Sequence, residues 1–287
     1  MASPLSADAL VRALKREGVH VVEHRSWRTH NRNHQGPFGP VNGVVIHHTA
    51  STGTDASVRL CYDGRPDLPG PLCHGVIAKD GTVHLVGHGR ANHAGLGDDD
   101  VLRRVIAEDY GTTPPTPNEN NTDGNTRFYG FEAINRGDGY DPWPHAQLEA
   151  IERASAAICR AHDWGAKSVI GHKEWTNQKI DPHGFGMPGM RERVAERLRH
   201  PAGWDPDQED EVTKDDIERI AAAVCDRLAN QDGVYPAPDD SESYATNKFW
   251  KFKSHVETQT RAARSARRAA ESADSKLDQV LALLRGK

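Results

Sequence analysis

The order of apolar and polar residues predicts short strands and helices along the first two thirds of the chain. Short runs rich in β-branched residues, bounded by glycine or asparagine, are typical of strands. Such runs occupy residues 19–24, 43–49, 126–135 and 168–172. Residues 74–87 read HGVIAKDGTVHLVG, where Asp80-Gly81 separates two apolar runs and predicts the turn of a β-hairpin.

Helical periodicity is found before, between and after these strands. Residues 145–164 follow Pro144 and place Leu148, Ile151 and Ile158 on one face, which predicts a helix of about five turns. Residues 1–18 predict a capped amphipathic helix, and residues 190–200 predict a closing helix. This mixed order predicts an α/β domain over residues 1–200, with a single central mixed β-sheet flanked by helices.

A different pattern follows residue 200. Residues 201–212 contain proline, glycine and many acidic residues, and they predict an acidic linker. Residues 213–287 predict a C-terminal helical region, with Thr213 as the N-cap of its first helix. An apolar seven-residue repeat over residues 249–287 predicts a coiled coil, and therefore a homo-oligomer. A lone amphipathic helix packed on the first domain is the alternative.

Composition and charge exclude several classes of protein. A net charge of −5 and a pI of about 6.3 argue against a nucleic-acid-binding protein. No apolar run reaches 18 residues, so no membrane span is expected. The N-terminal segment lacks the apolar core of a secretory signal, which predicts synthesis in a cytoplasm without a signal peptide. Four cysteines without a CxxC pair predict reduced thiols, while a Cys61–Cys73 bridge stays open.

The segment GHKEWTNQKIDPHGFGM, residues 171–187, concentrates residues suited to a hydrolytic metal centre. His172 and Asp181 are both metal-ligating types and lie nine residues apart across a loop. A catalytic zinc ion takes three protein ligands and keeps one position for water. The strand end VVIHHTAS offers the third ligand, but strand alternation lets only one of His47 and His48 face the site. The periodicity does not say which.

Two further residues would complete such a site. Lys179 lies two residues before Asp181, where its charge can stabilise the oxyanion formed when water attacks an amide. Glu132 lies in the apolar strand segment YGFEAIN, and a buried carboxylate near a metal is a good general base.

Five motifs in order carry a resemblance to a known family. GVVIHHTAS, HGVIAKDGTV, ANHAG, YGFEAIN and GHKEWTNQKIDP resemble the zinc N-acetylmuramoyl-L-alanine amidases of the type-2 amidase and peptidoglycan-recognition-protein family. The similarity is greatest to endolysins of phages that infect actinobacteria.

The resemblance implies a role for each matched residue. It implies zinc ligation by His47, His172 and Asp181, with His48 in a variable slot, and catalysis by Glu132 and Lys179. Cys73 stands where some relatives have a tyrosine, so the variant assisted by glutamate is favoured. The substrate contacts expected from it are His93, Trp175 and Asn135.

The implied reaction is hydrolysis of the amide between N-acetylmuramic acid and L-alanine in peptidoglycan, with one zinc ion per catalytic domain. As an endolysin, the chain would be made in the host cytoplasm and act on the cell wall after release. A non-catalytic peptidoglycan-binding protein and a structural virion component with a similar fold are the alternatives. The tail could bind the cell wall or only self-associate.

Overall fold

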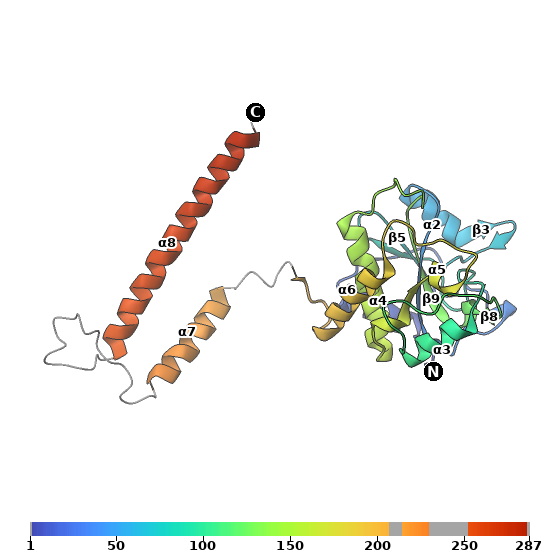
Figure 1. Ribbon diagram of the computed structural model, residues 1–287, viewed down its shortest axis with the longest axis horizontal. Coiled ribbons are helices and arrows are strands. Elements are labelled where there is room, and N and C mark those ends of the chain that lie inside the picture. Colours follow the sequence, from blue (N-terminus) through green and yellow to red (C-terminus); the bar gives the residue numbers. More distant parts are fainter. Residues whose placement is uncertain (1, 207–213, 230–251, 286–287) are drawn as a thin grey trace. The chain divides into compact units, whose positions relative to one another are not determined.

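The computed structural model describes residues 2–206, 214–229 and 252–285. Its internal contacts divide the chain into two units, Met1–Asp205 and Pro206–Lys287. All of the strands found in the described residues lie in the first unit, and the second unit is drawn as two long helices (Figure 1).

A six-stranded mixed sheet forms the centre of the first unit, in the order β1–β6–β5–β9–β2–β10. The bounds in that order are Val21–Glu23, Val83–Leu85, Gly75–Ile77, Phe128–Ala133, Gly43–His48 and Val169–Gly171. Every neighbouring pair is parallel except the β5–β6 hairpin, which is antiparallel. The predicted hairpin, strands and α/β fold class are confirmed.

One face of the sheet is covered by α1, α4 and α6, which span Ala7–Arg16, His145–His162 and Met187–Arg199. These are the three helices that the sequence predicts within residues 1–200. Val44 and Ile46 of β2 point into this face and belong to the same buried cluster as Leu10, Ile158 and Met190 of the helices.

The opposite face is covered by α2 (Thr54–Asp63), α3 (Asp99–Ala107) and the single turn α5 (His172–Trp175). Val45 of β2 lies on this face and packs with Val101 of α3 and Trp175 of α5. Two small ribbons flank it, formed by pairing of β3 (Gly64–Arg65) with β4 (Leu68–Pro69) and of β7 (Leu96–Gly97) with β8 (Thr122–Asp123). Three short 3-10 turns, η1 (Asn33–Gln35), η2 (Gly124–Thr126) and η3 (Ala166–Ser168), complete the unit.

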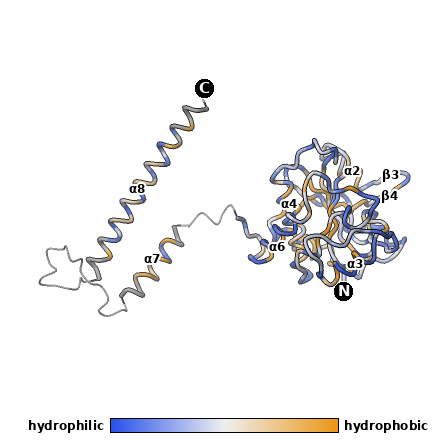
Figure 2. Tube along the Cα trace, viewed as in Figure 1, coloured by the Kyte–Doolittle hydropathy of each residue, from blue (hydrophilic) through white to orange (hydrophobic). Residues whose placement is uncertain are grey.

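The second unit contains α7 (Lys214–Ala229) and α8 (Phe252–Arg285). Residues 259–277 of α8 are all exposed, and hydrophobic positions along both helices are interspersed with hydrophilic ones, as Figure 2 shows. Thr213, Phe249 and Lys287, which the sequence analysis assigned to a cap and to the repeat, lie outside the described residues. None of the described helices combines the length and the hydropathy needed to cross a membrane.

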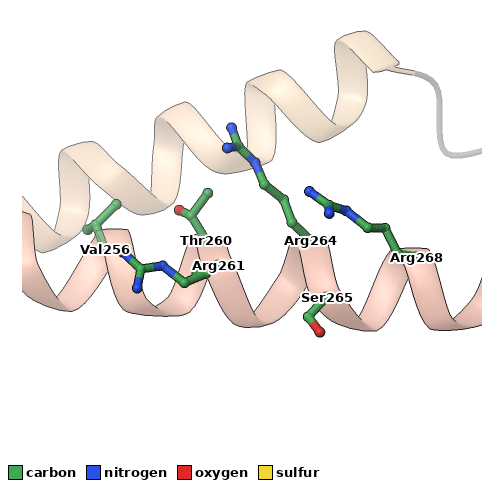
Figure 3. A pocket seen from close by; sticks show the side chains of 6 residues that line it. All are labelled: Val256, Thr260, Arg261, Arg264, Ser265 and Arg268. Carbon is green, nitrogen blue, oxygen red and sulfur yellow. The ribbon is translucent and has the colours of Figure 1, made fainter.

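A hollow of about 520 Å³ runs along α8 (Figure 3). It is lined by Val256, Thr260, Arg261, Arg264, Ser265 and Arg268. Its charged groups are all guanidinium groups, which cannot ligate a metal, so this hollow is no alternative to the metal site expected in the first unit.

Candidate metal and catalytic site

The site lies at the carboxyl ends of β2, β9 and β10, where ligand sites of parallel sheets commonly form. His47 is the penultimate residue of β2 and stands in register with Glu132 of β9. Partners in a parallel pair project from the same face, so both side chains lie on the face covered by α3 and α5. His172 is the first residue of α5, directly after β10, which pairs with β2.

The chain after α5 folds back so that Asp181 faces the two histidines. The Lys173 backbone N–H donates to the carbonyl oxygen of Asp181 at 2.7 Å, and its Nζ donates to the carbonyl of Pro182 at 2.6 Å. Glu174 accepts hydrogen bonds from Arg191 of α6 at 2.7 and 2.9 Å, which anchors α5 itself. The loop is therefore fixed at the point where a ligand is required.

Three ligand atoms converge at this point. Nδ1 of His47 lies 2.9 Å from Nδ1 of His172 and 3.0 Å from Oδ2 of Asp181. Nδ1 of His172 lies 3.1 Å from the same carboxylate oxygen. Ligand atoms about 2.0–2.1 Å from a tetrahedral zinc ion lie roughly 3.3 Å apart, so the triangle has nearly the size that zinc requires. Within the described residues, this is the one cluster of His, Cys, Asp or Glu found able to hold a metal ion.

The charges of these groups suit a cation. Burial, followed by the neighbouring His172, lowers the pKa of His47 to about 4, so the ring is neutral at neutral pH and can offer a lone pair. Burial acts to raise the pKa of Asp181, but hydrogen bonds with His172 and His47 outweigh it, and the pKa falls below its usual value. Two imidazole rings and one carboxylate are among the ligand sets found at catalytic zinc sites, so the residues fit this metal.

Glu132 is half-buried beside the cluster, and its Oε2 is shielded from solvent without a hydrogen-bond partner. Burial, followed by the negative charge of Asp181, raises the pKa of Glu132 to about 8, while the charge of Lys179 opposes the rise. A buried carboxylate without a partner is costly and needs an explanation, and a role in proton transfer is one.

Lys179 is exposed and borders a cavity of about 190 Å³ that reaches the site. Residues 92–96 form much of the cavity wall, together with Leu68, Asn125, Thr176 and Gln178. His172 also lines the cavity, which gives the metal cluster a route to solvent.

His48 points to the other side of the sheet, as strand alternation requires. Its Nδ1 accepts a hydrogen bond from the backbone N–H of His183 at 3.2 Å. His47, and not His48, is therefore the histidine of β2 that faces His172 and Asp181.

Two of the three side chains expected to contact substrate are placed differently from that expectation. Trp175 is completely buried and packs on Phe128, with ring centroids 5.1 Å apart. Asn135 is also buried, and its amide bonds the Asp141 carbonyl and the Gly137 N–H, so it shapes a loop. Neither side chain can contact a substrate, because neighbouring strands and helices shield both from solvent.

His93 lines the cavity but is also buried, and both of its ring nitrogens have partners. Nδ1 lies 3.1 Å from Nε2 of His47, and Nε2 lies 3.0 Å from the carbonyl oxygen of Phe128. The sequence analysis missed this contact with His47 and also the role of Asn125, whose side chain fixes the His93 segment. The ANHAG motif was the available signal, but it gave no hint of the partner.

Cys61 and Cys73 are buried free thiols, as is Cys159. Burial, followed by a hydrogen bond with Cys61, raises the pKa of the Cys73 thiol. The position where some relatives carry a tyrosine is thus held by a neutral thiol, which is a weak hydrogen-bond donor.

Residues 37–184, just over half of the chain, match the family model described as N-acetylmuramoyl-L-alanine amidase (Amidase_2). The chain belongs to this amidase family. The matched range contains the three ligand residues together with Glu132 and Lys179. A search among curated proteins gave no match.

Several solved structures are similar to this amidase. An endolysin amidase, LysCS from Clostridium intestinale, shares 16% identity over 61% of this chain and 94% of its own, with a TM-score of 0.41. The hydrolase AmiA from Staphylococcus aureus shares 13% sequence identity over 70% of this chain and 98% of its own, with a TM-score of 0.43. The Ph2119 endolysin of a Thermus scotoductus bacteriophage shares 17% sequence identity over 61% of this chain and 99% of its own, with a TM-score of 0.39. The family assignment rests on the sequence match.

Proposed function

We propose that this amidase hydrolyses the amide between the lactyl group of N-acetylmuramic acid and L-alanine in peptidoglycan. One zinc ion would be held by His47, His172 and Asp181. The observation that carries the proposal is the convergence of three buried ligand atoms, 2.9–3.1 Å apart, beside the unpartnered carboxyl group of Glu132. When bound, zinc supplies a water molecule of lowered pKa and polarises the carbonyl of the substrate.

Glu132 is the proposed general base and acid. It would accept the proton of the attacking water and return it to the nitrogen of L-alanine as the amide bond breaks. Its raised pKa of about 8 suits the second step. A cation bound beside Asp181 would offset the negative charge that contributes to this rise, and so favour the ionised form needed for the first step.

Lys179 is the proposed cation for the negative charge that develops on the amide oxygen. It is exposed on the wall of the cavity that reaches His172. Its positive charge disfavours protonation of both Glu132 and His47, although burial has the larger effect on each pKa. A positive group held near the reacting carbonyl before the reaction begins stabilises the transition state more than the ground state.

We also propose that the protein is a phage endolysin that degrades the cell wall, after synthesis in the host cytoplasm. The support is the order of five sequence motifs, which resembles endolysins of phages that infect actinobacteria. Retention of all three metal ligands, Glu132 and Lys179 favours an enzyme over a non-catalytic binder of peptidoglycan. The C-terminal helix α8 is proposed to join chains into an oligomer.

Digestion of purified peptidoglycan tests the reaction. The full chain should release a free amino group on L-alanine and leave the muramic acid with a lactyl carboxylate, both of which mass spectrometry identifies. Chelation should abolish release, and added zinc should restore it. Binding to the walls without any release, in a zinc-loaded chain, would instead favour a peptidoglycan-binding protein.

A further inference from the structure

His47 can bind a metal through Nδ1 only if the hydrogen of its neutral ring is on the other nitrogen, Nε2. A neutral imidazole carries one N–H and one lone pair. Nδ1 of His47 faces His172 and Asp181, whereas Nε2 faces His93. Metal binding through Nδ1 therefore requires the hydrogen to reside on Nε2, and something must favour that tautomer.

His93 has its own tautomer fixed from its far side. Its Nε2 lies 3.0 Å from the carbonyl oxygen of Phe128, which can only accept a hydrogen bond. A carbonyl oxygen cannot donate, so a neutral His93 ring carries its hydrogen on Nε2. With its hydrogen on Nε2, the lone pair of His93 is on Nδ1, 3.1 Å from Nε2 of His47.

We propose that His93 is a positioning residue that sets the tautomer of His47. The Phe128 carbonyl accepts from Nε2–H of His93, Nδ1 of His93 accepts from Nε2–H of His47, and Nδ1 of His47 is left with its lone pair directed at the metal. The inference rests on the proposed zinc site and adds a residue that acts through a ligand. Partners of this kind orient metal-binding histidines and raise their basicity.

The same short segment serves the second histidine ligand. Nε2 of His172 lies 3.1 Å from the carbonyl oxygen of Ala94, the residue after His93, so its lone pair is also left on Nδ1. The Asn125 side-chain oxygen accepts hydrogen bonds from the backbone N–H groups of His93, Ala94 and Gly95 at 2.9, 2.9 and 3.2 Å. Asn125 thus fixes the segment that orients both ligands.

Gly130 makes room for this arrangement. It lies in β9 opposite Val45, two residues before the pair formed by His47 and Glu132. A Cβ atom at Gly130 would lie 2.4 Å from Nδ1 of His93, so any side chain would displace the ring. The strand motif YGFEAIN therefore requires glycine at this position because the His93 ring lies against the backbone of the sheet.

The tautomers can be measured in the unaltered chain. Nitrogen-15 NMR of the full-length protein, with labelled histidine, should show hydrogen on Nε2 and none on Nδ1 for His93 with and without zinc. His47 and His172 should show the same pattern once zinc is bound. Hydrogen on Nδ1 of His93 would overturn the proposal, whether or not the chain proves to be a zinc enzyme. This result does not depend on any variant folding.

Zinc affinity of full-length variants, measured by competition with a coloured chelator, tests the consequence. His93→Phe keeps a ring but offers no acceptor to His47, and zinc affinity should fall about 10–100-fold. His93→Asn places an oxygen near the position of Nδ1 and should retain affinity within about threefold of the parent chain, by the same reasoning. Equal affinity of His93→Phe and the parent, or equal loss in both variants, would remove His93 from this role.

His74→Phe is the matched control. His74 is equally buried, with its ring 5.6 Å from His93, and it bonds the Gly89 carbonyl and the Gly130 N–H rather than a metal ligand. It should lose stability to unfolding but keep the zinc affinity of the parent once folded. If His74→Phe lowers zinc affinity as much as His93→Phe, the effect is general loosening of the core and the proposal is wrong.

Discussion

Two arginine–glutamate pairs show how differently the two units use the same side chains. Arg197 of α6 is 1% exposed and pairs with Glu152, with Glu149 at 3.2 Å and with the Trp204 carbonyl at 2.7 Å. Arg267 of α8 pairs with Glu271 one turn further along, at 2.8 Å, with 76% of its side chain exposed. Water screens the second pair and competes for its hydrogen bonds, so only the first constrains the structure strongly.

The metal site follows the logic of the first pair. His47, His172 and Asp181 are buried and lie within hydrogen-bond distance of one another. Glu132 beside them is half-buried, and its Oε2 has no partner. The charged side chains of residues 259–277 in α8 are instead exposed to solvent. Chemistry in the first unit and association through the second can therefore be tested separately.

Loss of a metal ligand should have the largest effect. His47→Ala should lose zinc and reduce amide hydrolysis by about 10³-fold or more, because the metal contributes several kcal/mol of transition-state stabilisation. His48→Ala is the control, since that ring faces away from the cluster, and it should keep both zinc and activity. Elemental analysis with a peptidoglycan assay decides between them; the reverse pattern would exchange the roles of the two histidines.

Removal of the proposed base should spare the metal. Glu132→Gln should retain zinc and lose about 10²–10⁴-fold in rate, because it removes the proton acceptor while keeping the shape. Lys179→Ala should also retain zinc, and its rate should fall about 10²–10³-fold because the negative charge on the amide oxygen loses a stabilising cation. Rates on a soluble muropeptide and metal content are the measurements, and parental rates in either variant would exclude that residue from the mechanism.

The two arginine pairs should differ sharply in stability. Arg197→Ala should lower the free energy of unfolding by about 3–5 kcal/mol, because it leaves buried carboxylates without their partner. Arg267→Ala should change it by about 0.5 kcal/mol or less, as for exposed pairs one helical turn apart. Chemical denaturation of both variants gives the comparison, and similar losses would mean that burial does not distinguish the two units.

Glu132 should also impose a pH dependence on the stability of the zinc-free chain. Its pKa rises from 4.5 to about 8 on folding, so between these values the folded chain holds a proton that the unfolded chain has released. Its contribution to stability therefore falls as pH rises through this window, by up to a few kcal/mol, since each pKa unit corresponds to about 1.4 kcal/mol. Glu132→Gln should gain stability relative to the parent between pH 5 and pH 8, as measured by denaturation with a chelator present; no relative gain would show that Glu132 ionises freely.

Truncation should have the smallest effect on chemistry. A chain ending at residue 206 should keep its zinc and cleave soluble muropeptides at the parental rate, because every proposed catalytic residue precedes residue 182. The full chain should self-associate through α8, weakly, since the alanine-rich middle of the repeat buries little apolar area. Light scattering over a concentration series tests this, and a full chain that stays monomeric at high micromolar concentration would exclude the coiled coil.

The local pattern of the sequence was enough to predict the principal strands and the helices of one face of the sheet. It did not reveal α2, α3 or α5. Helix α5 has only four residues, too few to show a helical period. Helices α2 and α3 do carry apolar residues on a buried face, but the sequence analysis did not identify them. The sequence analysis did identify the three residues of the metal cluster. His172 and Asp181 lie within one segment, and the order of the motifs, which resembles a known family, added His47.

The sequence by itself determined the principal strands, the helices of one face of the sheet, the fold class, the family and the set of candidate ligands. Strand periodicity left His47 and His48 open and the family resemblance favoured His47, which the structure places toward the cluster. Only the tertiary structure decided that Trp175 and Asn135 are buried and that the His93 ring contacts His47. The physical reason is that periodicity records which face of an element avoids water, whereas these decisions depend on partners far apart in the chain. Nδ1 atoms 2.9 Å apart in His47 and His172 belong to residues separated by 125 positions.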